Sequence, residues 1–259
     1  MRVASGQVFS FCLYLAASAV LLWSITAGRR GRQPRVREIA GLQAIEEAVG
    51  RSAEMGKPVH YSLGIGGLIK SHGPMTLAGL SVLGHVAQVV ARYDVQLIVT
   101  VSQPEVLPLA SDIVRQAFAN EGKQDLYQID TVRFLSTNQF AYAAGVMGLV
   151  QREKVAANIM MGWFAGESML LAEAGHEAGG IQIAGTANIS QLPFFAASCD
   201  YTLIGEELYV AGAVLSGDAV QLASIKGQDI IKILLWLLAA LGTISVALGS
   251  AWLKSLMAK

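Results

Sequence analysis

Two long stretches without a charged residue, one near each end of the chain, constrain its fold most. The first runs from Val8 to Gly28 and the second from Ile233 to Leu253, and each is 21 residues long. About 20 helical residues cross the ~30 Å hydrocarbon core of a bilayer, and a buried core helix rarely stays uncharged over such a length. We therefore expect one transmembrane helix within residues 1–28, and a second one with a short tail within residues 229–259.

The positive charges around the first stretch favour an uncleaved span over a cleaved signal peptide. A secretory signal carries its positive charge before the apolar run, but only Arg2 lies there. A basic juxtamembrane collar instead follows the run over residues 29–37, and it consists of Arg29, Arg30, Arg32, Arg35 and Arg37. The positive-inside rule then predicts a cytoplasmic main domain with both termini outside. We expect this chain in the cell (inner) membrane.

The basic collar also has a second interpretation, because arginines near a membrane attract anionic lipid headgroups. Membrane lipids are therefore an expected partner, although the topological role alone would explain the collar. The central domain, residues 38–228, differs in charge: it carries 18 acidic and 10 basic side chains, a net charge of −8. Such a domain repels polyanions, so we expect no nucleic-acid partner. Two cysteines are too few for a disulfide framework or a Cys-rich zinc module.

Within the central domain, short apolar segments alternate with segments of helical periodicity. The clearest strand is the β-branched run from Val95 to Val101, which has no helical pattern. Further strands are predicted at 59–62, 131–135, 155–161, 181–186 and 201–204. Helices are predicted at 38–54, 76–92, 105–120, 138–152, 166–178 and 190–197, and from residue 206 onward. This alternation predicts an α/β fold, a mostly parallel sheet of five or six strands with helices on both faces, which is Rossmann-like.

Small and polar residues gather after several of the predicted strands. The carboxyl ends of parallel strands border the crevice in which such folds bind ligands. Glycine lets backbone N–H groups approach a ligand, and helix N-termini favour anions. The alternative is that these loops need such residues only to turn and to cap helices. The candidate ligand-binding residues are Ser62, Gly64, Gly66, Gly67, His72, Gly166 and Asn188.

Motifs with a more specific chemistry are incomplete. The run from Gly64 lacks the third glycine of a dinucleotide fingerprint. The run from Gly166 lacks the second glycine of a nucleophile elbow. His60 is expected to be a core residue, and Glu173 and His176 are expected on a solvated helix face. We therefore predict no catalytic residue, no metal site and no cofactor, and whether the chain is an enzyme stays open.

Helical segments without a polar face favour association of the chain with other subunits. The segment 138–150 (NQFAYAAGVMGLV) is nearly apolar all round, as is 209–215. A helix without a polar face has to be covered on all sides by the sheet, a neighbour or another subunit. In the second apolar stretch, Ser245 and Gly249 are one turn apart, and so are Ala247 and Ala251; small residues at this spacing permit close helix packing. We expect a homo-oligomer or a subunit of a membrane complex.

Three segments carry a resemblance to a known family: HYSLGIGG at 60–67, SHGPMTL at 71–77 and GTANISQL at 185–192. Together with the terminal spans they resemble a domain of unknown function, an uncharacterised family of bacterial and archaeal two-pass membrane-anchored α/β proteins. The resemblance covers nearly the whole chain and implies a prokaryotic membrane setting without an activity. The main hypothesis is thus a membrane-anchored domain that acts by assembly, as an oligomeric scaffold or accessory subunit. The alternative is a membrane-tethered domain, either a binding domain or an enzyme, that binds a small ligand or nucleotide at the glycine-rich edge.

Overall fold

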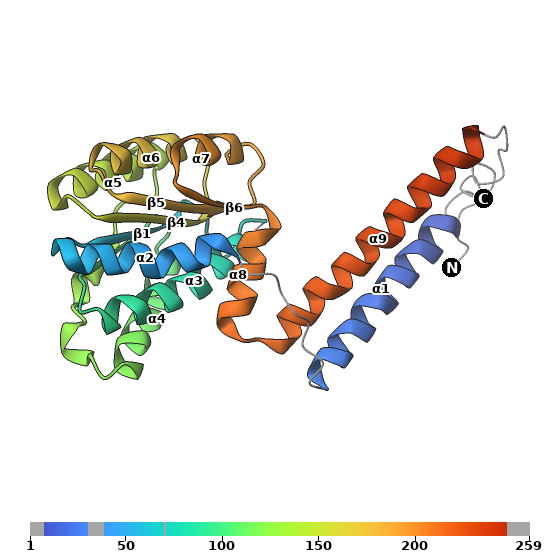
Figure 1. Ribbon diagram of the computed structural model, residues 1–259, viewed down its shortest axis with the longest axis horizontal. Helices are drawn as coiled ribbons and strands as arrows, with labels where there is room; N and C mark the ends of the chain where they lie inside the picture. Colours follow the sequence, from blue (N-terminus) through green and yellow to red (C-terminus); the bar gives the residue numbers. More distant parts are fainter. Residues whose placement is uncertain (1–7, 31–38, 70, 248–259) are drawn as a thin grey trace. The chain divides into compact units, whose positions relative to one another are not determined.

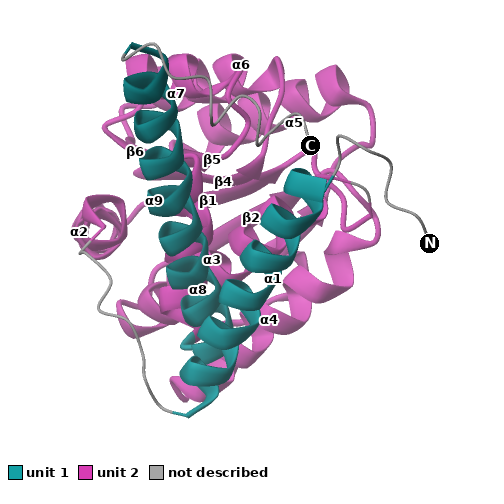
Figure 2. Cartoon of the chain, turned by 90° about the vertical axis from the view of Figure 1, so that its right-hand side faces the viewer, with its two compact units in different colours: residues 1–36, 217–259 teal, residues 37–216 magenta. Residues whose placement is uncertain are grey.

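The computed structural model of the chain describes residues 8–30, 39–69 and 71–247. Three arginines of the basic collar, Arg32, Arg35 and Arg37, lie outside the described residues, as do Gly249 and Ala251. The chain divides into two compact units. One contains residues 1–36 and 217–259, and the other contains residues 37–216 (Figure 2). Each unit is described by itself below.

The larger unit contains a six-stranded sheet in the order β3-β2-β1-β4-β5-β6, in which all neighbouring strands run parallel. The strands are β1 (Val59–Gly64), β2 (Leu97–Val101), β3 (Val132–Phe134), β4 (Ala157–Trp163), β5 (Ile181–Thr186) and β6 (Tyr201–Ile204). The predicted fold class is therefore confirmed. The strand order was beyond prediction, because nothing in the apolar pattern of a strand specifies its neighbours.

Helices cover both faces of this sheet (Figure 1). One face is covered by α2 (Ala40–Met55), α3 (Gly73–Arg92), α4 (Val106–Asn120) and α8 (Glu206–Ser216). The other face is covered by α5 (Gln139–Glu153), α6 (Glu167–Glu177) and α7 (Leu192–Ser198). Two short 3-10 helices, η1 (Gln124–Leu126) and η2 (Ile129–Thr131), lie between α4 and β3.

Each face of the sheet has its own apolar core. Successive side chains of a strand point to opposite faces, so Tyr61 and Val99 belong to the core under α2, α3, α4 and α8. Ile98 and Met160 belong to the core under α5, α6 and α7. All six residues of β1 are buried. This double coverage explains why the central strands are continuous apolar runs in the sequence.

Helix α3 shows why glycines occur in an apolar helical segment. Its sequence predicts a helix from residue 76, but the helix begins at Gly73, with Pro74 in its first turn. A Cβ atom added at Gly79 would lie 2.3 Å from the backbone oxygen of Met161 in β4. The glycine therefore costs helix propensity but permits close contact between the helix and the sheet.

Helix α5 begins at Gln139, one residue after the predicted start, and Asn138 is its N-cap. The side chain of Asn138 accepts hydrogen bonds from the backbone N–H groups of Phe140 and Ala141, both at 3.1 Å. We expect Asn138→Ala to lower the free energy of unfolding by about 1 kcal/mol, the usual cost of losing an N-cap. Urea unfolding in detergent, followed by circular dichroism, measures the change. Asn120→Ala, at the exposed carboxyl end of α4, is the control; an equal loss there would contradict the capping role.

The smaller unit contains two apolar helices, α1 (Val8–Arg29) and α9 (Ala219–Ala247), which pack antiparallel (Figures 1 and 2). Small residues line the contact: a Cβ atom added at Gly28 would lie 2.3 Å from Cβ of Ala223. The Ser24 hydroxyl donates a hydrogen bond to the Ala223 carbonyl oxygen at 2.5 Å. The helix α9 begins at Ala219, so residues 219–228, which the sequence analysis assigned to the central domain, form its first turns.

Three helices in the described part of the chain are long and apolar enough to cross a membrane: α1, α3 and α9. Within α3, 61% of the apolar window is buried, which makes it a core helix of the larger unit. For α1 and α9 the buried share is only 6% each. These two helices, one toward each end of the chain, could span a membrane.

Candidate functional site at the carboxyl edge of the sheet

The strand order creates a switch point between β1 and β4 at the centre of the sheet. From β1 the chain continues toward β2 and β3, and from β4 it continues toward β5 and β6. Ligands of open parallel sheets bind at such a point, outside the carboxyl ends of the strands. The candidate residues Ser62 and Gly64 lie at the carboxyl end of β1, Gly66 and Gly67 follow the strand, and Gly166 follows β4. The structure thus brings the two loops together at this edge.

The three candidate glycines at the end of β1 and just after it pack closely against other parts of the chain. Gly64 has a φ of +73°, and a Cβ atom there would lie 2.1 Å from the backbone oxygen of Trp163. A Cβ atom at Gly66 would lie 2.8 Å from both Thr76 Oγ1 and Trp163 Cβ, and one at Gly67 would lie 2.6 Å from Glu105 Oε1. Their missing side chains therefore let the β1 loop pack against β4, α3 and the start of α4.

His72, the strongest titratable candidate from the sequence, precedes α3 and packs on an aromatic ring. The ring centroids of His72 and Trp163 are 3.9 Å apart and their planes are tilted by 37°. Both residues are half-buried. The imidazole and the indole thus lie together over the loop that follows β1.

Gly166 and Asn188 lie in the neighbouring loops. A Cβ atom at Gly166 would lie 3.6 Å from Gln139 Nε2, an ordinary contact, so a side chain would fit there. The Asn188 amide donates to the Phe164 carbonyl at 2.7 Å, and its oxygen accepts from the Ser190 backbone N–H at 3.3 Å. Asn188 therefore connects the loop after β5 to the loop after β4.

Glu167 is the most polar group buried at this edge. It is the first residue of α6, where the helix dipole stabilises a carboxylate, and its side chain is completely buried. Its Oε2 accepts from Gln139 Nε2 at 2.7 Å, and its Oε1 accepts from the Ala165 backbone N–H at 3.0 Å. Burial raises the pKa of this carboxyl above its ordinary value, and the hydrogen bonds partly oppose that rise. No sequence motif indicates that a carboxyl group is buried beside the switch point.

A second polar feature crosses the sheet beneath α5 and α6. His60 Nδ1 lies 2.7 Å from Asn158 Oδ1, and His60 Nε2 lies 2.9 Å from Thr100 Oγ1. The hydroxyl of Tyr142 lies 3.0 Å from Thr100 Oγ1 and 2.8 Å from Ser62 Oγ. All five residues are fully buried. The candidate Ser62 thus belongs to a closed hydrogen-bond network.

The protonation state of His60 follows from this burial. Desolvation lowers the pKa of the imidazole to about 4, although the hydrogen bond to Asn158 opposes the shift. The ring is therefore neutral near pH 7, with one nitrogen free to donate and the other to accept. The expectation that His60 is a core residue is confirmed. Its partners Asn158 and Thr100, and Tyr142 beyond Thr100, were missed because they lie on three other elements. On α6, Glu173 and His176 are exposed, as the sequence predicts.

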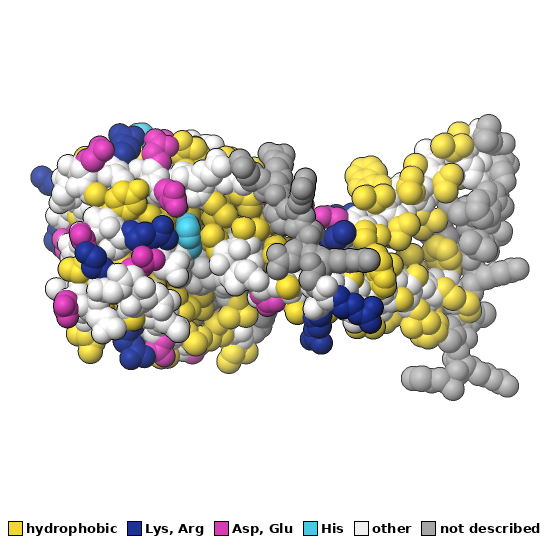
Figure 3. Space-filling model, turned by 60° about the horizontal axis from the view of Figure 1, so that its bottom comes forward, with side chains coloured by type: hydrophobic (Ala, Val, Ile, Leu, Met, Phe, Trp, Pro, Cys, Tyr) yellow, Lys and Arg dark blue, Asp and Glu magenta, His cyan; other side chains and the backbone are white. Residues whose placement is uncertain are grey.

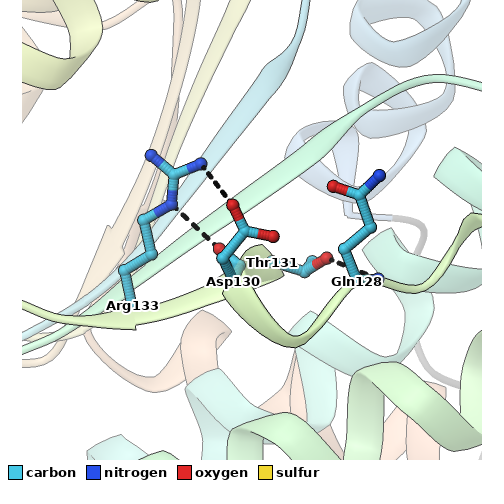
Figure 4. Close-up of polar contacts among 4 residues, drawn as sticks. All are labelled: Gln128, Asp130, Thr131 and Arg133. Atoms are coloured by element: carbon cyan, nitrogen blue, oxygen red, sulfur yellow. Dashed lines mark hydrogen bonds and ion pairs between the residues drawn. The ribbon is translucent and has the colours of Figure 1, made fainter.

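A concave site lies at the opposite edge of the sheet, where β2 begins. A cavity of about 320 Å³ there is lined by Asp94, Val95, Gln96, Leu97, Phe118, Leu126, Gln128, Asp130, Thr131 and Arg133. Figure 4 shows Arg133 donating from Nε to the Asp130 carbonyl oxygen at 2.9 Å, with its Nη2 3.5 Å from Asp130 Oδ2. The Thr131 hydroxyl accepts from the Gln128 backbone N–H at 3.3 Å. These polar groups form hydrogen bonds with one another. None of the candidate ligand-binding residues lines this cavity.

The molecule is thus an all-parallel α/β domain in a chain that also carries two apolar helices able to span a membrane. Residues 2–257 match the family model described as "Domain of unknown function (DUF6754)", and the chain belongs to this family. The expected membership of an uncharacterised family is confirmed. Neither the curated proteins nor the solved structures contain a match to this chain.

Proposed function

We propose that the chain is a membrane-anchored α/β protein that acts by assembly, as an oligomeric scaffold or an accessory subunit of a membrane complex. Its helices α1 and α9 expose large apolar side chains, among them Leu22, Trp236 and Leu241, which suits a lipid environment. The five arginines of the basic collar, Arg29 to Arg37, favour a cytoplasmic main domain with both termini outside. The family resemblance suggests a prokaryotic inner membrane.

The outward side of α5 carries the assembly part of this proposal. Its inner side packs into the core through residues such as Tyr142 and Val146. Its outer side presents Ala141 and Ala144, both exposed, and the half-buried Gly148. No charged residue occurs in the helix before Arg152. A surface helix of a soluble domain normally has a polar outer face, and small residues allow a second helix to approach closely.

Native mass spectrometry of the full chain, extracted gently in detergent, tests assembly. We expect a defined oligomer or a mixed complex for the natural chain. Ala144→Arg should shift the population to the monomer, because a buried, unpaired charge at an interface is strongly unfavourable. Arginine is a good helix former, so α5 itself should remain intact.

The matched control is Gln116→Arg, which adds the same charge to the exposed side of α4. It should leave the subunit number unchanged. A monomeric natural chain would contradict the proposal, as would an Ala144→Arg variant with an unchanged mass.

The second candidate function is a membrane-tethered domain, either a binding domain or an enzyme, that takes a small ligand or nucleotide at the carboxyl edge. The buried carboxyl of Glu167 beside the switch point favours it, because perturbed carboxyl groups cluster at functional sites. The close packing of Gly64, Gly66 and Gly67 against the chain argues the other way. A stoichiometric small-molecule mass retained in the same spectra would favour this candidate over assembly.

A further inference from the structure

Large apolar side chains are exposed along one edge of the α/β domain. In an all-parallel sheet, each segment that follows a strand leaves from the carboxyl edge. Five exposed apolar residues lie in such segments, either in the loop or in the first two turns of the next helix. A sixth is the last residue of its strand. This apolar rim consists of Ile69, Leu77, Phe140, Met169, Ile189 and Ile204. Each is more than half exposed, and Ile189 is 81% exposed.

Charged side chains gather at the opposite edge. The segments at the start of the strands and the ends of the helices carry the exposed Asp94, Asp130 and Lys154 and the half-buried Lys57 and Lys123. In Figure 3 most of the charged side chains of the domain lie in its left-hand half, with apolar side chains among them. Exposed apolar residues, among them Met55, Tyr93 and Ile129, also occur at this opposite edge, so charged and apolar side chains are mixed there, whereas the rim edge carries the six apolar residues above.

The chain connects to both membrane helices from the rim edge. Helix α2 begins there, since a Cβ atom at Gly41 would lie 2.2 Å from Leu203 Cδ1 near the end of β6. Helix α8 follows β6 directly and packs on the second turn of α3, where a Cβ atom at Gly212 would lie 3.1 Å from Ala78 Cα. Only Gly217 and Asp218 separate α8 from α9. A residue spans at most about 3.6 Å, so this tether is short.

We propose that the apolar rim inserts into the interfacial layer of the bilayer that holds α1 and α9. The proposal rests on the proposed membrane anchoring. Apolar side chains at separate loop tips and helix starts enter the boundary between headgroups and acyl chains, and the buried apolar area supplies the affinity. Glu105 and Glu206 lie at the same edge, so the attraction is apolar and suits a zwitterionic surface.

A second copy of the chain is the other occupant that an apolar rim could have. Two copies anchored in one bilayer with the same topology have parallel orientations. Their tethered edges then both face the bilayer, and the two rims cannot face each other. Lipid is therefore the occupant that fits double tethering at this edge.

Spin labelling of the full chain in phosphatidylcholine nanodiscs tests the proposal. Cys12 and Cys199 are replaced by serine, and a nitroxide is attached through Ile189→Cys. Oxygen partitions into lipid and a neutral nickel chelate stays in water, so their collision rates with the label report its surroundings. We expect the oxygen-to-nickel ratio at position 189 to exceed, several-fold, the ratio for Ile129→Cys. Ile129 is 91% exposed but lies in η2, at the opposite edge, which makes it a matched control.

Equal ratios at positions 189 and 129 would overturn the proposal, and so would protection of position 189 from both reagents, which indicates a protein cover. A third label, at Leu237→Cys in α9, separates this failure from a failure of membrane anchoring. High oxygen access at 237 with none at 189 rejects the rim contact alone. Low oxygen access at 237 rejects the anchoring itself, and with it the rim contact.

Discussion

Gly64→Ala is expected to lower the free energy of unfolding of the α/β domain by about 2–5 kcal/mol. Two costs add up. The backbone at Gly64 has a φ of +73°, a conformation that residues with a side chain adopt only with strain. The new methyl group would also lie 2.1 Å from the backbone oxygen of Trp163, so β1 and β4 would have to separate. Urea unfolding in detergent, followed by circular dichroism, measures the loss.

Gly56→Ala separates these two costs. Gly56 has a φ of +61°, and among the described residues no heavy atom lies within 4 Å of its added Cβ. This variant carries only the conformational cost, about 1 kcal/mol. Equal losses for the two variants would show that the loop after β1 yields easily and would contradict the close packing of Gly64. That result would also strengthen the ligand-binding candidate, because a yielding loop can open.

His60 is expected to make the domain less stable in mild acid. Its pKa is about 4 in the folded protein, against an ordinary value of 6.5 that applies to the unfolded chain. Between these values the unfolded chain binds a proton that the folded protein does not, so stability falls as the pH falls from 6.5 toward 4. Below pH 4 both states are protonated and the dependence ends. The whole contribution is about 3 kcal/mol.

The control is His60→Gln. The glutamine amide, like the neutral imidazole, offers a hydrogen-bond donor and an acceptor, but it does not titrate in this pH range. The free energies of unfolding of both proteins are measured by urea titration at several pH values. Other groups, including Glu167 with its raised pKa, titrate in both proteins, so the difference between the two slopes isolates His60. A variant with the same pH dependence as the natural chain would show that His60 does not change its protonation on unfolding.

The sequence predicted individual elements of the domain closely. The strands at 181–186 and 201–204 match β5 and β6, because buried strands are short apolar runs between turn residues. Boundaries that depend on tertiary contact were less accurate. The strand β1 extends two residues past Ser62 to Gly64 because it pairs there with Trp163 of β4. Similarly, α3 begins at Gly73, whose added Cβ would lie 2.4 Å from the Leu68 carbonyl oxygen.

The candidate site was predicted only in part. The sequence indicated which residues follow the strands, and parallel pairing then placed Gly64 and Gly166 near the same switch point. It gave no indication that Gly64 and Gly67 accommodate neighbouring groups of the chain, because a glycine required by close packing looks the same as one that contacts a ligand. Glu167 and the partners of His60 were missed for a related reason: burial and hydrogen bonding depend on residues far away in the sequence.

Local chemistry therefore determined what the sequence alone could establish: two uncharged segments long enough to span a bilayer, an α/β alternation, and the residues at the ends of the strands. Length, charge and periodicity are properties of neighbouring residues, so they can be recognised without a structure. The tertiary structure alone decided the strand order, the network that joins His60 to Asn158 and Thr100, and the apolar rim that includes Ile69 and Ile189. These features arise from contacts and exposure among segments far apart in the chain, which only the packed fold defines.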